Sequence, residues 1–325
     1  MKKTLVALAV LAASGASFAQ VTITGTYAAG YRASHIGATN ADAGGLGIDS
    51  SSLNFAAGED LGGGSKIAVY YGLDAANRSG AKGGNSGVDL TTGYGKFSYS
   101  LDEGSEFVTR AAGQAGGVSF DGKVTSSLSP AGDNFTYTAP AFGAVTLAFD
   151  YSESGAAEQA LGAGSAGDGA ITGQRQYQFR AAYAAGPLNA TARYATYDSK
   201  TGATMQDNRV RLAVSYDLGA AKVGAGYSRL AYGTGTRTDT AVTLNVPLGA
   251  TTVGASFANR NKDNIGNVTT GDGNASGYGL TASYAMSKRT SLNLSYANWT
   301  QANGGAVAPD ANKSTETNLL LAHSF

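Results

Sequence analysis

Strict alternation of large apolar residues with polar or small ones constrains this chain more than any other feature. The clearest example covers residues 209–218, where the apolar positions are Val210, Leu212, Val214, Tyr216 and Leu218. A period of two places the apolar side chains on one face of a β-strand and the polar ones on the other. The same alternation recurs at 145–151, 177–183, 242–246, 278–284 and 292–296. No sustained helical period appears beyond residue 19, so we expect an all-β protein.

Short and long connections alternate between these segments. The expected tight turns are at 60–64, 102–104, 140–143, 186–187, 217–219, 247–249 and 287–289. The expected long loops are at 34–50, 76–89, 113–132, 154–173, 199–207, 233–237, 261–276 and 300–314. Seven turns and eight loops join 16 strands, with short turns on one rim and long loops on the other. This arrangement is typical of a transmembrane antiparallel β-barrel with short periplasmic turns and long extracellular loops.

Composition agrees with a membrane barrel. The chain has 47 glycines, 5 prolines and only 14% charged residues, which does not suit a helical globule. Lipid offers backbone amides no hydrogen-bond partner, so a sheet in a membrane must close on itself. Sixteen strands leave an aqueous lumen. The alternative from the pattern alone is a secreted β-sandwich or β-helix, which also has alternating strands and glycine-rich turns.

The N-terminal segment 1–19 reads as a secretory signal peptide. Lys2 and Lys3 precede the apolar run 5–13, and Ala19 offers a small residue for cleavage before Gln20. The alternative is an uncleaved N-terminal anchor. We therefore expect residues 20–325 to form the barrel domain, exported to the outer membrane of a Gram-negative bacterium.

Four segments resemble the Gram-negative general porins of the β-proteobacterial type. The last strand ends on Phe325 after the alternating run 317–324. The other three matches are 52–66 (from Ser52 through Glu59-Asp60-Leu61 to Lys66), 137–143 (Tyr137 to Gly143) and 284–292 (Tyr284 to Leu292, with Ser287-Lys288-Arg289). Together they span most of the chain after residue 19.

The resemblance implies a homotrimer of 16-stranded barrels, each with a pore narrowed by its third long loop. It implies that Phe325 is a signal for the barrel-assembly machinery and that the partners are outer-membrane lipid and lipopolysaccharide. Two positions depart from the family pattern: Ser52 stands where an arginine is usual, and Thr109-Arg110-Ala111 where an Arg-Gln pair is usual. The third loop, 113–132, is also shorter than in the family.

The alternation predicts which charged side chains face the lumen, because a charge facing lipid at the bilayer midplane costs about 2–4 kcal/mol. The expected pore-lining or constriction residues are Lys66, Arg110, Asp121, Lys123, Arg180, Arg193, Arg209 and Arg211. The arginines would form a basic wall, and Asp121, with Asp133 at the exit of the loop, the facing acids. Opposed charges of this kind set the ion preference of a channel. The alternative for each arginine is a solvated place near the rim.

Other classes of function are disfavoured. The only histidines are His35 and His323, and neither has an acid neighbour in sequence that would make it a general base. The near-neutral net charge disfavours nucleic-acid binding. With no cysteine and no spaced series of acids, we expect no metal site and no cofactor. The sequence thus predicts a passive channel for small hydrophilic solutes and ions, not an enzyme. A substrate-specific channel, or a barrel with mainly adhesive loops, stays open.

Overall fold

A single antiparallel sheet accounts for most of the residues that the computed structural model describes. The structure describes residues 20–37, 40–77, 80–102, 107–108, 118, 120, 123–125, 132–154, 174–199, 206–232, 235–263, 274–301 and 313–325. Residues 1–19, where the sequence predicts a signal peptide, lie outside this set. Among the described residues no helix is both long and apolar enough to cross a membrane.

Sixteen strands are joined in sequence order. They are β1 (Gln20–Ile36), β2 (Ala41–Gly62), β3 (Ser65–Asn77), β4 (Gly80–Thr92), β5 (Gly95–Asp102), β6 (Gly132–Thr138), β7 (Val145–Ser154), β8 (Gln174–Ala185), β9 (Leu188–Ser199), β10 (Gln206–Asp217), β11 (Lys222–Tyr232), β12 (Gly235–Leu248), β13 (Thr251–Asp263), β14 (Ala275–Ala285), β15 (Thr290–Gln301) and β16 (Lys313–Ser324). The predicted strand number is confirmed.

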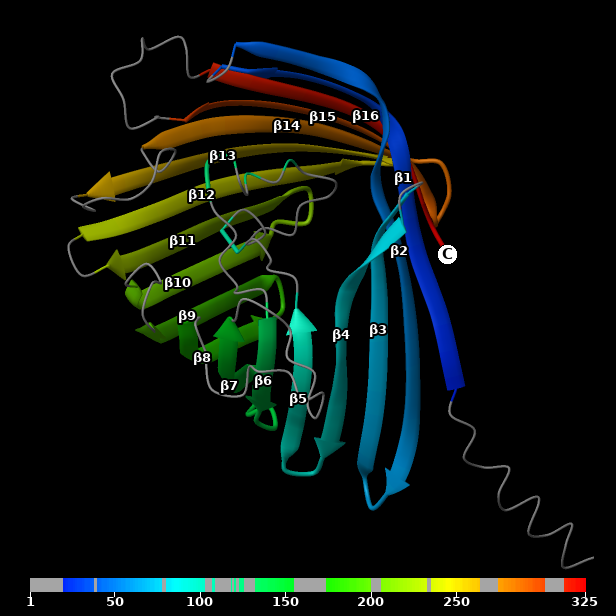
Figure 1. The fold of residues 1–325 in the computed structure, drawn as a ribbon, viewed down its shortest axis with the longest axis vertical. Coiled ribbons are helices and arrows are strands. Elements are labelled where there is room, and N and C mark those ends of the chain that lie inside the picture. The colour runs from blue at the N-terminus through cyan, green and yellow to red at the C-terminus, as the bar shows by residue number, and fades with distance from the viewer. Residues whose placement is uncertain are drawn as a thin grey trace, which may run out of the picture.

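The sheet closes into a barrel because the first strand pairs with the last. The ladder between β1 and β16 runs from Thr26 opposite Ser324 to His35 opposite Thr315. Figure 1 shows β1, in blue, beside β16, in red, with the C-terminus next to them. Closure satisfies the backbone of both edge strands, so the barrel has no open edge.

The barrel is apolar outside and polar inside, as the alternation predicts. Phe179 and Leu280 lie on the outer face with 64% and 52% of their surface exposed. Arg211 and Asp239 lie on the inner face and are only 1% exposed. This is the reverse of a soluble β-sandwich, so that alternative is excluded.

The predicted tight turn at 102–104 is wrong. Strand β5 continues to Asp102, and the tight turn lies at Gly93-Tyr94, where Thr92 pairs with Gly95. Asp-Glu-Gly resembles turn chemistry, but the chain reverses at Gly93-Tyr94, and Gly95 directly after them has a φ of +128°, which favours glycine. The long connection on the opposite rim therefore begins directly after Asp102.

Several predicted long loops are mostly strand. The predicted loop 34–50 is reduced to a short link, since β1 ends at Ile36 and β2 begins at Ala41, opposite it. Likewise β3 ends at Asn77 and β4 begins at Gly80, within the predicted loop 76–89. A ladder is held by backbone hydrogen bonds, so glycine-rich segments continue it without an apolar face. Beyond the lipid-facing band, side-chain alternation is no longer required.

Candidate functional site

A band of arginines crosses the inner face of the barrel on neighbouring strands. Pairing places Arg180 of β8 opposite Arg193 of β9, and Arg193 opposite Arg211 of β10. The band continues through Ser228 of β11 and Asp239 of β12 to Arg260 of β13. Arg209 and Arg237 lie on the same face, two residues from Arg211 and Asp239. We call the six arginines 180, 193, 209, 211, 237 and 260 the arginine wall.

Asp150 of β7 binds one end of the arginine wall. One carboxylate oxygen lies 3.3 Å from Arg180 Nη2 and accepts a 2.8 Å hydrogen bond from Thr136. The other oxygen accepts a 2.7 Å hydrogen bond from the amide nitrogen of Gln178. The amide oxygen of Gln178 then accepts a 3.0 Å hydrogen bond from Arg211. Gln178 of β8 thus links Asp150 of β7 to Arg211 of β10, three strands from the acid.

Asp239 holds the other end. Its carboxylate oxygens lie 3.1 Å from Arg260 Nε and 3.4 Å from Arg237 Nε. The hydroxyl of Ser228, its pairing neighbour, accepts a hydrogen bond of 3.3 Å from Arg209 Nε. Among the described residues, the six guanidinium groups of the wall thus lie between Asp150 at one end and Asp239 at the other.

The described part of the third long connection lies inside the barrel. Phe107 places its ring 4.8 Å from the Arg193 guanidinium and 5.3 Å from that of Arg211, within the range of cation–π contacts. The backbone of the next residue, Val108, packs so closely on Gly226 of β11 that a side chain there would collide with it. This end of the connection lies directly on the arginine wall.

A second part of the same connection packs on β14, three strands from β11 around the barrel. The Phe120 ring lies over Gly277 and Gly279 of β14, where an added Cβ would lie 3.0 and 3.3 Å from ring carbons. Small inward residues such as Ala258 and Ala297 join Trp299 in the same buried cluster. This lining of glycine and alanine leaves room for the connection within the barrel.

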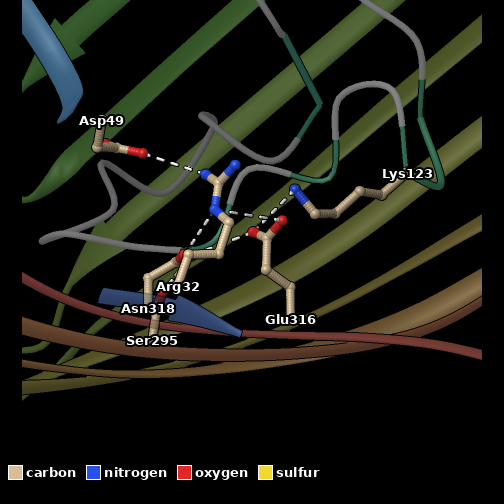
Figure 2. Close-up of polar contacts among 6 residues, drawn as sticks. All are labelled: Arg32, Asp49, Lys123, Ser295, Glu316 and Asn318. Atoms are coloured by element: carbon tan, nitrogen blue, oxygen red, sulfur yellow. Dashed lines mark hydrogen bonds and ion pairs between the residues drawn. The ribbon is translucent and has the colours of Figure 1, made fainter. Parts of the chain in front are cut away.

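Lys123 joins this part of the connection to β16. Its Nζ lies 3.3 Å from Glu316 Oε1, as Figure 2 shows. Glu316 also neighbours Arg32 of β1 and Asn318. The connection therefore contacts the barrel wall at two places, β9–β11 and β14–β16.

The predicted site residues fall into three groups. Arg180, Arg193, Arg209 and Arg211 come together in the arginine wall, although Arg209 and Arg211 are almost fully buried and the first two are half-buried. Lys123 lies across the lumen on Glu316. Lys66 faces the lumen from β3 and pairs with Asp60 next to the short turn between β2 and β3. It is not part of the arginine wall, which lies on β8 to β13. Arg110 and Asp121 lie outside the described residues.

The acids that meet the arginines differ from those expected. Asp133 shares the outward register of Phe135 on β6, so it does not face the arginine wall. Asp150 and Asp239 do so instead, with the unexpected arginines Arg237 and Arg260. Extending the alternation of 242–246 backward, and that of Phe257 forward, would have placed Asp239, Arg237 and Arg260 on the inner face. Of these three residues, only Arg237 lies in a segment that the sequence assigns to a loop, 233–237; Asp239 and Arg260 lie just outside the predicted loops.

Comparisons with known proteins agree with this architecture. A family model described as Gram-negative porin matches residues 4–304. No curated protein matches the sequence.

Solved structures with the same fold include porins. An anion-selective porin from Comamonas acidovorans is 19% identical, with a TM-score of 0.70 over 95% of this chain and 100% of that one. OmpT, an outer membrane protein of Vibrio cholerae solved in a trimer form, is 12% identical, with a TM-score of 0.66 over 94% of this chain and 99% of that one. At these identities the likeness is one of fold.

Proposed function

The chain belongs to the Gram-negative porin family, and we propose that its pore favours small anions over cations. As a member of that family it is an outer-membrane β-barrel that lets small hydrophilic solutes and ions diffuse passively. The arginine wall supports the anion preference, because among the described residues its six guanidinium groups outnumber the two carboxylates that contact them. In a lumen narrowed by protein, unbalanced charge acts more strongly than in bulk water.

Burial of the wall strengthens this argument. Arg209, Arg211, Arg237 and Arg260 are each at most 5% exposed, so water screens them poorly. Arg180 and Arg193 reach further toward the lumen, and they form the part of the wall that a passing ion meets first. The anion selectivity of the Comamonas acidovorans porin agrees with the proposal.

Reconstitution in a planar bilayer tests the proposal. Under a potassium chloride gradient, the reversal potential is expected to have the sign of chloride permeation. A reversal potential of the opposite sign would refute the anion preference and leave the channel itself intact. Saturation of the current by one solute would instead favour the substrate-specific alternative, and folded protein without conductance would favour adhesive loops.

We also propose that three chains form the working unit. The trimer form of the Vibrio cholerae OmpT structure supports this, and the same bilayer recordings test it through conductance steps in groups of three. Cleavage after Ala19, contact with lipopolysaccharide and reading of Phe325 by the assembly machinery complete the proposal. N-terminal sequencing of protein from outer membranes tests the cleavage site directly.

Porins are channels, and we propose that this member of the family is likewise not an enzyme. His35 does have an acid neighbour, contrary to expectation, since its Nδ1 lies 2.8 Å from Asp42. That is the only hydrogen bond of its ring among the described residues, so no hydroxyl nucleophile is attached to the pair. His323 lies on the outer face and contacts Thr290. We propose that neither histidine takes part in a reaction.

A further inference from the structure

A junction of three chain segments holds the constricting connection against the barrel wall. Lys123 comes from the connection, Glu316 and Asn318 from β16, and Arg32 from β1 (Figure 2). Only 21% of the Lys123 side chain and 13% of the Glu316 side chain are exposed. A pair this far out of solvent is screened less by salt than a surface pair.

The carboxylate of Glu316 is fixed by its own neighbours. Asn318 donates a 3.1 Å hydrogen bond to Oε1 and accepts one of 2.8 Å from Arg32 Nε. Arg32 Nε also lies 3.9 Å from Glu316 Oε2, and its Nη2 lies 3.2 Å from Asp49 of β2. Because Arg32 pairs with Asn318 across the closure of the barrel, this arrangement exists only once β1 and β16 have joined.

Lys123 is equally constrained. The backbone amides of Lys123, Val124 and Thr125 all donate to the carbonyl of Phe120, which makes a compact turn. Val124 and Thr125 are fully buried, and the Lys123 ammonium lies 5.5 Å from the ring of Trp299. Through these hydrogen bonds the position of Lys123 is tied to that of Phe120.

We propose that Glu316 is a positioning residue, which sets the place of Val118, Phe120 and residues 123–125 in the lumen, and hence the pore width, through its ion pair with Lys123. Arg32 and Asn318 orient the carboxylate. The inference rests on the proposed function, since it requires a conducting pore. Apolar packing of Phe120 keeps the segment inside the barrel, while the ion pair fixes it against the β16 side.

Single-channel recording of charge variants tests the junction. Glu316→Gln and Lys123→Gln each remove the ion pair with little change in volume. Each is expected to raise the rate of brief current fluctuations by about fivefold, as for the loss of a partly buried ion pair. Because the pair is mostly out of solvent, the fluctuations of the original protein should increase only weakly with salt, and in either variant they should not depend on it at all.

The exchange variant carrying both Lys123→Glu and Glu316→Lys restores the pair in reverse. It is expected to return the fluctuation rate to the original level, which a general loss of structure could not produce. Glu59→Gln, on the periplasmic end of β2, is the control for removing one acid. The double variant Lys123→Gln with Glu316→Gln should fluctuate no more than either single variant.

Additive effects of the two single changes, or no recovery in the exchange variant, would overturn the inference. In both cases the channel would still conduct, so the proposed function would stand. A complete lack of conductance in the original protein would instead refute the proposed function. Glu316→Gln changes a strand residue and could prevent folding. In that case the fluctuation rate of Lys123→Gln and its salt dependence still test the ion pair, because this variant leaves every strand unchanged.

Discussion

Arg180 and Arg193 lie at the lumen side of the arginine wall, where single charges affect passing ions directly. Two unit charges 4 Å apart interact with an energy of about 1 kcal/mol in water. Replacing both arginines by glutamine is therefore expected to lower the anion-to-cation permeability ratio by about two- to fivefold. The measurement is the reversal potential in a salt gradient. Arg229→Gln is the control, because Arg229 is exposed on the outer register of β11. An equal effect in the control would refute the assignment of the first pair to the pore.

Gly279 is a residue whose lack of a side chain makes room for the connection. A Cβ there would lie 3.1 Å from Val118 and 3.3 Å from the Phe120 ring. Gly279→Val is therefore expected to push the segment off the wall, with a strain of about 1–3 kcal/mol, and to change the single-channel conductance. Gly45→Val is the matched control, since nothing lies within 4 Å of the same atom at that inner-wall position. Unchanged conductance in Gly279→Val would contradict this packing.

At the scale of the elements, closure of β1 on β16 ends in a contact between Gly25 and Phe325. Their backbones exchange two hydrogen bonds of 3.0 Å, and the Phe325 ring covers the place where a Cβ of Gly25 would be. The terminal aromatic ring thus needs glycine opposite it. The contact lies where the last strand meets the first.

Gly25→Ala is expected to weaken this closure by about 1–3 kcal/mol, because the added methyl group has no space. The measurement is the thermal unfolding midpoint of the barrel in detergent. Gly93→Ala, in a tight turn with open space, should leave the midpoint unchanged. Combining Gly25→Ala with Phe325→Ala should cost less than the sum of the two single changes, and strict additivity would argue against the contact.

At the scale of the whole molecule, the barrel depends on an apolar exterior in contact with hydrocarbon. Leu294 of β15 is 48% exposed on the outer face, while the adjacent Asn293 faces the lumen. Leu294→Arg is expected to lower the free energy of unfolding in lipid vesicles by about 2–4 kcal/mol. Asn293→Arg should cost much less, because its side chain meets water. A larger cost for Asn293→Arg would reverse the assignment of the two faces.

Local patterns in the sequence predicted the fold well. A period of two is a property of neighbouring residues, so it revealed the strands and placed Arg180, Arg193, Arg209 and Arg211 on the inner face. It failed where a strand continues into glycine-rich sequence, as in residues 41–50 of β2, because backbone hydrogen bonds alone maintain the ladder there. The turn at Gly93-Tyr94 was missed for a related reason, since Asp102-Glu103-Gly104 has a stronger turn composition.

The sequence by itself determined a closed 16-stranded barrel with its apolar side outward, since alternation and turn spacing are local and lipid permits no open edge. Only the tertiary structure decided which charges meet. Asp150 with Arg180, Asp239 between Arg237 and Arg260, and Lys123 with Glu316 are brought together by strand register and by the entry of the connection into the lumen. The tertiary structure also decided that Arg209 and Arg211 are buried. Burial depends on segments that are distant in the chain, and a local sequence pattern carries no information about them.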